Sequence, residues 1–434
     1  MAAKKALSFD YVIIGNSAAG IGAVEGIRSV DAKGSIAILS DERYHTYSRP
    51  LISYYLGKKV TSESNMYYRP KGFYKHHGVE PLLGCKVVSI DKKAKEIALK
   101  DGRRIIFKKL LIATGGVPFV PPIEDLEGED VYTFTTWDEA KKVAKAAGPD
   151  TAAVVIGGGL IGLKAAEGLI EIGVKVTVVE LADRILSTIL DVKGSKMFEA
   201  HLKNLGSKVI TGDTVTAIKR KAESGKKKEE RVTGVVLKSG KEIACDMVIV
   251  AIGVVPNTAL AKTAGIKMER GIIVDGHLRT SEKDIYAAGD VVETFDVLRK
   301  VRRPQPIWPN AYTQGYAAGL NMAGFIFEYE GSFGMNSVEV CGLPTITVGM
   351  YDAAGKGYEE IVKSGPEKDS YKKIILKDDR IVGAVFVGDI DRAGIVTGLI
   401  KDRVKVSDFK KYLLTYEFGY AVFPKELRKE RLSR

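Results

Sequence analysis

The chain has 434 residues, with 66 Lys and Arg, 54 Asp and Glu and a formal net charge of +12. This length is ample for several domains of ordinary size, each with its own core, and the composition gives no sign of disorder. No apolar stretch is long enough to cross a bilayer, and residues 1–15 show neither a long apolar signal region nor an Arg-rich presequence, so we expect a cytoplasmic location.

The first motif is a glycine-rich turn, GNSAAG at 15–20, between an apolar segment and an apolar helix. Residues 11–14 predict a buried parallel strand, and Ala18 begins the predicted helix. Such a turn cradles a pyrophosphate, because the helix N-terminus offers unbonded N–H groups and a partial positive charge. Ser17 stands where a glycine is usual. Nucleotide contacts are expected at Gly15, Ser17, Ala18, Ala19 and Gly20.

A second and complete glycine motif, GGGLIG, lies at 157–162. The predicted strand at 174–179 is followed by Glu180, placed where a carboxylate can bind both hydroxyls of an adenosine ribose. A carboxylate there would repel a 2′-phosphate, which favours NAD(H) over NADP(H), although the nearby Arg184 weakens this preference. NAD contacts are expected at Gly157, Gly159, Leu160, Ile161, Gly162 and Glu180.

Three later segments extend the pattern. Residues 108–122 and 246–257 are apolar strands that end in glycine and then proline, and residues 285–293 form a strand ending in Gly289 and Asp290. With the two glycine motifs, these segments resemble the pyridine nucleotide-disulfide oxidoreductase superfamily of flavoproteins over about three quarters of the chain. The resemblance implies two cofactors, FAD and NAD.

The resemblance also implies roles for individual residues. Ala113, Thr114 and Gly115 would lie beside the FAD, and Asp290 would bind its ribityl chain; a turn-capping Asp is the alternative. The helix predicted at 308–324 would direct its N-terminus at the flavin pyrimidine ring. Further contacts are implied at Gly289, Trp308 and Gln314 for FAD and at Gly253 for NAD.

The implied fold is α/β, with two Rossmann-like dinucleotide-binding domains and an α+β C-terminal domain. The first and last motifs must meet on one FAD while the second glycine motif lies between them, so the NAD domain is inserted into the FAD domain. We expect the FAD domain at 1–118 and 246–328, the NAD(H) domain at 119–245, and an interface or docking domain at 329–434. The charge run at 219–231 is expected to be a solvated hairpin tip.

Residues 42–57, ERYHTYSRPLISYYLG, resemble the YxRPxLS segment of NADH-dependent rubredoxin, ferredoxin and nitrite reductases within the superfamily. By this analogy, Arg49 reaches the FAD pyrophosphate or the isoalloxazine edge, and Pro50 lines the ring. Asp41 or Glu42, at the end of the second strand, would take the FAD adenosine ribose.

Two residues depart from the family pattern. Tyr54 stands where several ferredoxin-reductase relatives have a Lys near flavin N5, and Lys164 stands where relatives commonly have a Glu near the nicotinamide. Ordinary aromatic packing and a Lys that reaches solvent are the alternatives. The histidines at 45, 76, 77, 201 and 277 show no metal-ligand spacing, so no metal site is predicted.

The cysteines argue against thiol chemistry. Cys85, Cys245 and Cys341 are the only three in the chain, and none lies where disulfide reductases have their redox pair or related enzymes their single cysteine. Each is expected to be a small buried hydrophobic residue. The three do not resemble a zinc or iron–sulfur ligand set. No catalytic side chain is therefore predicted beyond the flavin itself.

A hydride carrier, a flavin and no redox thiol predict an FAD-dependent NAD(H) oxidoreductase. The flavin exchanges hydride at N5 and can exchange electrons singly, which NAD cannot. The predicted partner is rubredoxin, ferredoxin or the iron–sulfur subunits of a larger complex, such as an aldehyde or phenylglyoxylate-type 2-oxoacid oxidoreductase. The positive charge, densest at 298–306 and 425–434, would steer acidic carriers to the enzyme.

Two other functions remain open from the sequence: a peroxide-forming NADH oxidase, and a basic FAD protein whose redox state controls association. Nucleic-acid binding is the weaker explanation of the charge because no recognition motif accompanies it. No membrane partner is expected.

Overall fold

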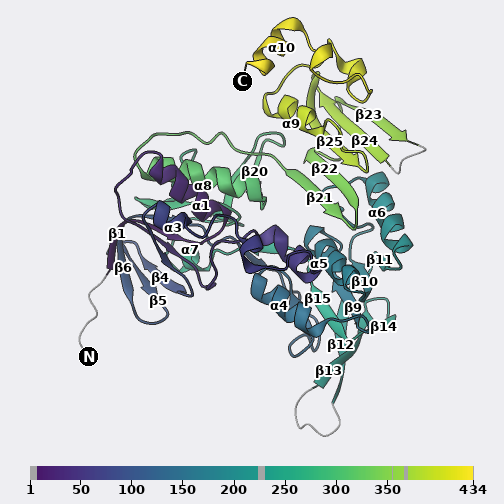
Figure 1. Ribbon diagram of the computed structural model, residues 1–434, viewed down its shortest axis with the longest axis horizontal. Helices are drawn as coiled ribbons and strands as arrows, with labels where there is room; N and C mark the ends of the chain where they lie inside the picture. The colour runs from purple at the N-terminus through teal and green to yellow at the C-terminus, as the bar shows by residue number, and fades with distance from the viewer. Residues whose placement is uncertain (1–6, 223–229, 354, 366–369, 434) are drawn as a thin grey trace. The chain divides into compact units, whose positions relative to one another are not determined.

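The computed structural model describes residues 7–222, 230–353, 355–365 and 370–433 (Figure 1). The described chain forms two compact units. The first unit takes the residues up to 119 together with 135–140 and 253–332, and the second takes 120–134, 141–252 and 333 onward. Helix α4 (Trp137–Ala146) begins in the first unit and ends in the second.

The first unit is built on a seven-stranded sheet of order β3-β2-β1-β6-β5-β4, with β18 also paired to β6. The strands β3, β2, β1, β6 and β18 are parallel, whereas β4, β5 and β6 form an antiparallel meander. The strands of this sheet are β1 Leu7–Ile14, β2 Ile36–Leu39, β3 Val79–Leu82, β4 Val87–Asp91, β5 Glu96–Leu99, β6 Arg104–Ile112 and β18 Ile285–Ala287.

Two helices of this unit pack backbone to backbone, α1 (Ala18–Arg28) and α8 (Trp308–Met322). A Cβ on Gly22 would lie 2.4 Å from the Tyr312 carbonyl oxygen, and one on Gly315 would lie 2.0 Å from that of Ala19. Glycine is therefore required on both helices at this crossing. The remaining elements of the unit are α2 Ile52–Leu56, α3 Phe73–His76, α7 Ala259–Thr263, the pair β7 Gly116–Pro118 and β16 Val254–Pro256, and the sheet of β17 Ile272–Ile273, β19 Val292–Asp296 and β20 Val301–Pro304.

The second unit contains a five-stranded parallel sheet of order β11-β10-β9-β15-β8 and a separate antiparallel sheet of order β21-β22-β25-β24-β23. Its parallel strands are β8 Val131–Thr133, β9 Ala152–Ile156, β10 Lys175–Glu180, β11 Lys208–Thr211 and β15 Met247–Val250. A third sheet has β12 Val215–Ala222, β13 Glu230–Leu237 and β14 Glu242–Ala244, and the helices are α5 Leu160–Glu171 and α6 Val192–Asn204.

The C-terminal region begins with the antiparallel sheet and ends in helices (Figure 1). Burial alternates along β22, as expected for a strand with one face on a core. The elements are β21 Met335–Val340, β22 Leu343–Gly349, β23 Tyr358–Gly365, β24 Ser370–Lys377, β25 Arg380–Val387, α9 Ala393–Lys401 and α10 Lys425–Leu432.

The predicted α/β fold, with two dinucleotide-binding sheets and an α+β C-terminal region, is confirmed. One expected boundary is wrong. The FAD domain is expected to resume at residue 246, but β15 pairs in parallel with β9 and belongs to the parallel sheet of the second unit. The antiparallel strands β12 and β13 flank the expected hairpin tip, while residues 223–229 lie outside the described part. Within the described residues, no helix combines the length and the apolar character needed to span a membrane.

Candidate functional site

The first glycine turn is fixed by steric limits at both ends. Gly15 has φ of +127°, and a Cβ there would lie 2.0 Å from the carbonyl oxygen of Ala113. A Cβ on Gly20 would lie 1.9 Å from the carbonyl oxygen of Gly15. Ser17 is the N-cap of α1 with extended backbone, and its side chain makes no capping hydrogen bond within the described residues. The first N–H groups of α1 therefore face the turn without a side-chain cap.

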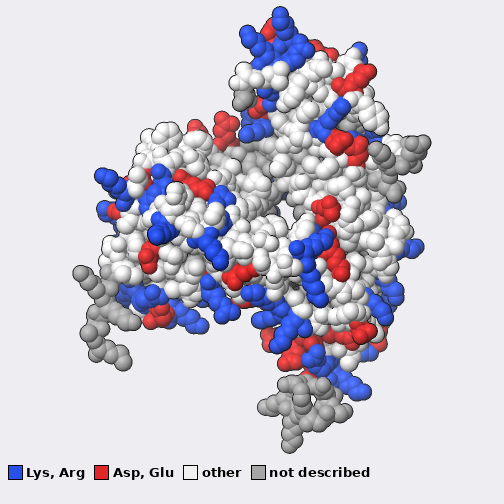
Figure 2. All heavy atoms as spheres, viewed as in Figure 1, with Lys and Arg blue, Asp and Glu red and all other residues white. Residues whose placement is uncertain are grey.

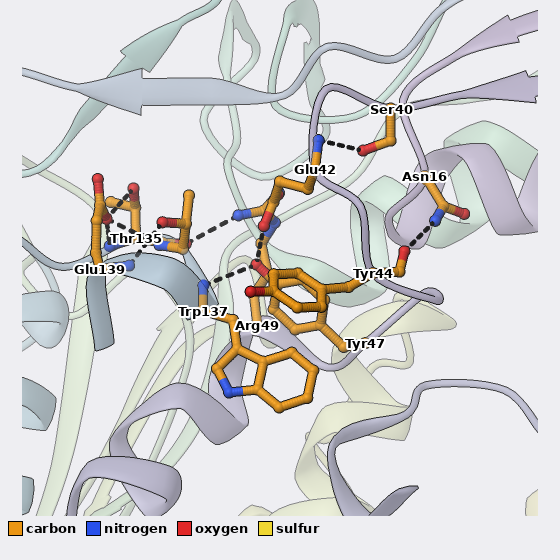
Figure 3. A network of polar contacts seen from close by, with 10 residues as sticks. Asn16, Ser40, Glu42, Tyr44, Tyr47, Arg49, Thr135, Trp137 and Glu139 are labelled. Atoms are coloured by element: carbon orange, nitrogen blue, oxygen red, sulfur yellow. Dashed lines mark hydrogen bonds and ion pairs between the residues drawn. The ribbon is translucent and has the colours of Figure 1, made fainter. Parts of the chain in front are cut away.

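A pocket opens beside this turn, at the carboxyl ends of β1 and β2 (Figure 3). Ala18 and Ala19, which follow Ser17 in α1, are buried. Asp41 is exposed and does not line the pocket, whereas Glu42 does. The pocket is lined by Asn16, Ser17, Ser40, Glu42, Tyr44, Tyr47 and Arg49.

Glu42 and Arg49 meet in this pocket as an ion pair. Arg49 also donates to the Thr135 carbonyl oxygen at 2.9 Å, and its guanidinium lies over the Tyr47 ring. The Tyr47 hydroxyl donates to Glu42 Oε2 at 2.6 Å and accepts from the Trp137 N–H at 3.1 Å. The carboxylate of Glu42 can accept hydrogen bonds from the hydroxyl groups of a ligand, and the guanidinium of Arg49 can donate to phosphate oxygens. Pro50, next in the chain, is exposed.

Segment 135–140 contacts the residues that line the pocket, and nothing in the sequence predicts this position. The buried Trp137 packs against Tyr44 at 4.8 Å and against Tyr47 at 5.4 Å between ring centroids. The Tyr44 hydroxyl donates to Asp138. A capping box begins helix α4 here, since Glu139 accepts from the backbone N–H of Thr136 at 2.9 Å. That local pattern was visible in the sequence, but the place of the segment beside the pocket was not.

The other predicted FAD segments converge on the same edge of the sheet. Ala113 donates its N–H to the Ile14 carbonyl oxygen at 2.8 Å, and Gly289 donates to Gln314 Oε1 at 2.8 Å. The Thr114 hydroxyl donates to the Asn257 carbonyl oxygen at 2.8 Å. Gly115 and Gly289 both have left-handed φ, at +68° and +87°. Trp308 is the first residue of α8.

Asp290 follows Gly289 at the end of β18 and is partly buried. Burial raises its pKa to about 6, against the lowering effect of the Arg49 charge. A ligand that donates hydrogen bonds to a carboxylate with a raised pKa would stabilise its charged form.

The second glycine turn repeats the first in the other unit. Gly157 has φ of +110°, and a Cβ there would lie 2.5 Å from the Ala251 carbonyl oxygen, while one on Gly162 would lie 1.9 Å from that of Gly157. Leu160 and Ile161 open helix α5. Gly253, also expected at the NAD site, belongs to the first unit and has φ of +112°.

Glu180 at the end of β10 is held by the backbone, because its carboxylate accepts from the N–H groups of Gly158 at 2.6 Å and Ala182 at 2.7 Å. Arg184, which weakened the preference for NAD(H), pairs with Asp183 at 2.8 Å. These contacts agree with a site for an adenosine ribose without a 2′-phosphate.

Lys164 neither reaches freely into solvent nor stands alone on its helix. Its ammonium pairs with Glu167 and donates to the Glu339 carbonyl oxygen at 3.0 Å. Glu167 is buried and accepts from the Cys341 N–H at 2.8 Å. The solvent alternative for Lys164 is therefore wrong, because this side chain connects α5 to strand β21.

The expectation that all three cysteines are buried hydrophobic residues is confirmed for one and wrong for two. Cys245 is buried, and burial raises its pKa to about 12. Cys85 is partly exposed and its Sγ accepts from Arg103 at 2.9 Å, while Cys341 occupies a left-handed turn with φ of +51°. All three are free thiols. In the described ranges, no group of His, Cys, Asp and Glu could hold a metal ion.

Comparison with known proteins places these observations in a family. Residues 9–315 match the model of the pyridine nucleotide-disulphide oxidoreductases. The chain belongs to this family. It is accordingly an oxidoreductase that uses FAD and NAD(H). The glycine turns without room for a side chain, the uncapped helix α1 and the Glu42–Arg49 pair fit a bound dinucleotide in the first unit.

Further matches cover the C-terminal region and most of the chain. Residues 335–404 match the rubredoxin NAD+ reductase C-terminal domain. The NADH-dependent phenylglyoxylate dehydrogenase subunit epsilon of Aromatoleum evansii is 28% identical over 92% of this chain and 93% of that subunit. The rubredoxin-NAD(+) reductase of Pseudomonas putida is 33% identical over 64% of this chain and 71% of that protein. The crystal structure of the covalent putidaredoxin reductase–putidaredoxin complex matches with a TM-score of 0.82, at 26% identity over 92% of this chain and 94% of that chain.

Proposed function

We propose that this chain passes electrons between NAD(H) and a one-electron iron–sulfur protein or subunit. FAD, when bound, supplies the exchange of a hydride with the nicotinamide and of single electrons with the partner. The roles of the protein are to bind both nucleotides, to orient them and to exclude water between them.

The observation that carries the proposal is the surroundings of the cysteines. Cys85 is the one cysteine of the first unit. Its backbone N–H donates to the carbonyl oxygen of Ser40 at 2.7 Å, and Ser40 lines the pocket together with Glu42. Its sulfur is bound by Arg103 rather than directed at the segments Ala113–Gly115 or Gly289–Asp290. A flavoenzyme of this family that has no thiol at those segments cannot pass the electrons of its reduced flavin to a disulfide of its own. It must therefore pass them to a separate acceptor.

The relatives support the same conclusion and two forms of it. One is named a reductase of rubredoxin, and one solved structure holds a reductase covalently joined to putidaredoxin. Another is named a subunit of a dehydrogenase. We propose a free reductase or an NAD-binding subunit on this basis, with the FAD contacts at the residues of the first unit named above and the NAD contacts at Gly157–Gly162 and Glu180.

The test is purification of the chain from its native cells under anaerobic conditions, followed by NADH oxidation assays with rubredoxin, ferredoxin and O2. Co-purifying iron–sulfur subunits establish the subunit form, and rapid reduction of a carrier by the chain alone establishes the free form. Rapid peroxide formation with no reduction of either carrier would overturn the proposal in favour of an NADH oxidase.

A further inference from the structure

A basic and aromatic segment borders the FAD site of the first unit. Between Lys58 and His77 the chain has five Lys or Arg and one carboxylate, Glu63. This segment is less than a twentieth of the chain and holds about a third of its net positive charge. In the view of Figure 2, Lys and Arg occur in several patches with Asp and Glu among them. Residues 298–306 of the same unit are also rich in Lys and Arg. The contacts of segment 58–77 with residues beside the pocket, and not its charge alone, therefore make it the candidate surface.

The backbone fixes this segment next to the pocket of the first unit. Ser48 donates its N–H to the Met66 carbonyl oxygen at 2.8 Å, and Tyr68 donates to that of Thr46 at 2.9 Å. Residues 66–68 therefore run antiparallel to residues 46–48, which lead directly into Arg49. A protein bound to the basic segment would lie beside the residues that we propose hold FAD.

Arg69 ties the segment to the two helices that pack at the FAD site. Its guanidinium donates to Glu25 Oε1 at 2.7 Å and Oε2 at 3.2 Å, and the Tyr312 hydroxyl donates to the same carboxylate at 2.6 Å. Glu25 belongs to α1 and Tyr312 to α8. Although burial acts the other way, these two partners hold the pKa of Glu25 below its ordinary value. The Arg69–Glu25 pair is thus a fixed anchor, and the exposed lysines around it supply the net charge.

Aromatic rings connect the start of α8 to this surface. The Tyr68 ring meets the Trp308 ring edge to face, with 5.0 Å between centroids, and both side chains are partly buried. The Arg69 guanidinium lies 4.1 Å above the Tyr68 ring, and the Lys71 ammonium lies 5.9 Å from the Tyr67 ring. The contacts of Trp308 with Tyr68 and of Tyr68 with Arg69 thus join the first residue of α8 to the basic segment.

We propose that the surface made by residues 58–77 and the first turn of α8 is the docking site of an acidic iron–sulfur protein. The inference rests on the proposed function and identifies the partner's place. Charge complementarity selects an acidic partner. Trp308 and Tyr68 would then lie between the cluster of the docked partner and the FAD site. In the overall reaction, NADH and two oxidised one-electron carriers give NAD+, one proton and two reduced carriers.

The decisive variant is Lys71→Glu/Lys75→Glu, since both lysines are exposed. The FAD-loaded chain is assayed with saturating NADH, using either an acidic ferredoxin or ferricyanide as the acceptor. At low salt we expect the KM for ferredoxin to rise roughly tenfold, with kcat within about twofold, and the effect to shrink at 0.5 M NaCl because salt screens exposed charges. Reduction of ferricyanide, a small acceptor that needs no docking surface, should stay unchanged.

The matched control is Lys86→Glu/Lys100→Glu, which makes the same charge change at two exposed lysines of the same unit outside this surface. Equal KM values for ferredoxin in the two double variants would overturn the docking site while the proposed function stands. A wild-type chain that reduces ferricyanide but no iron–sulfur carrier would refute the proposed function itself.

The ring contact is tested separately with Tyr68→Leu and Tyr68→Phe. The leucine variant should lower kcat with ferredoxin at least about fivefold and leave the ferricyanide rate unchanged, and the phenylalanine variant should restore kcat, because the ring and not the hydroxyl meets Trp308. Equal kcat values with ferredoxin in the wild type and the leucine variant would remove Tyr68 from the route.

Discussion

The two glycine turns share their ends and differ in the middle. In both, the first glycine has a left-handed backbone and no room for a Cβ, and the last glycine would place a Cβ 1.9 Å from the carbonyl oxygen of the first. At the middle position, Ser17 and Gly159 are both extended. A Cβ built on Gly159 meets no described atom within 4 Å. Packing within the protein requires glycine at both ends of each turn. In the absence of a ligand, it does not require glycine at the middle position.

The turns also differ in how their acidic residue is held. Glu42 is bound by the side chains of Arg49 and Tyr47, which come from a segment outside the βαβ unit. Glu180 is bound by the backbone N–H groups of its own turn and strand end. The first site therefore depends on a tertiary contact that the second does not need.

Substitution of the last glycine should separate the two sites most strongly. Gly20→Val should abolish FAD binding, because the side chain would displace the turn backbone. Gly162→Val should leave the flavin spectrum intact and reduce kcat/KM for NADH by more than about a hundredfold. Absorbance of the purified variants and flavin reduction by NADH measure both effects. Loss of flavin from Gly162→Val would contradict the assignment of one nucleotide to each turn.

Removal of the acidic residues should have intermediate effects. Glu180→Ala removes the carboxylate that we expect to bind the adenosine ribose. The KM for NADH should rise at least about tenfold and the preference for NADH over NADPH should narrow, since one hydrogen bond to a charged group is worth about 1.5–3 kcal/mol. Glu42→Ala should leave that preference unchanged and weaken FAD retention instead. Steady-state kinetics with both nucleotides and FAD titration of the apoprotein distinguish the two. A changed preference for NADH over NADPH in Glu42→Ala would contradict the assignment of Glu42 to the FAD site and Glu180 to the NAD(H) site.

The raised pKa of Asp290 makes the stability of the first unit depend on pH. The unfolded carboxyl releases its proton near its ordinary pKa and the folded one near 6, so the native apoprotein binds more protons between about pH 4 and pH 6. Its free energy of unfolding should fall as pH rises through this range and level off above it. Asp290→Asn should remove at most about 3 kcal/mol of this dependence, less where solvent reaches the side chain. Urea unfolding of the wild-type and Asp290→Asn apoproteins at pH 4.5 and 7.5 measures this. An equal change in the free energy of unfolding between the two pH values in both proteins would contradict it.

The smallest effect is expected from exchange of the middle residues. Gly159→Ser and Ser17→Gly should each change the melting temperature of the apoprotein by no more than about 2 °C, because both positions are extended and the Cβ position of Gly159 is open. Differential scanning calorimetry measures this. A large loss of stability in Gly159→Ser would show that the middle residue is fixed by packing after all.

Local sequence patterns sufficed for the parts of the fold that depend on local physics. The strands that enter both turns, the helices that leave them and the glycine positions follow from periodicity and backbone sterics, and the structure confirms these elements. The boundary at residue 246 was placed wrongly in relation to β15, because an apolar strand of this length suits either parallel sheet and only the pairing with β9 decides.

The unpredicted parts of the site depend on contacts between distant segments. Trp137 packs against Tyr44, which lines the pocket, because residues 135–140 belong to the first unit although the residues on both sides of them belong to the second. Lys164 is held by a carbonyl oxygen at Glu339. Neither the contact of Trp137 with Tyr44 nor that of Lys164 with Glu339 can be inferred from the sequence, because no local periodicity relates residues so far apart in the chain.

The most direct test of the central claim is the stoichiometry of carrier reduction. The FAD-loaded chain is mixed anaerobically with limiting NADH and excess oxidised rubredoxin or ferredoxin, and NADH loss and carrier reduction are followed together. Two carriers reduced for each NADH consumed, within many turnovers, is the result expected of an enzyme that links hydride to single-electron transfer. NADH oxidation that begins only when O2 is admitted, with peroxide formed and no carrier reduced, would contradict it.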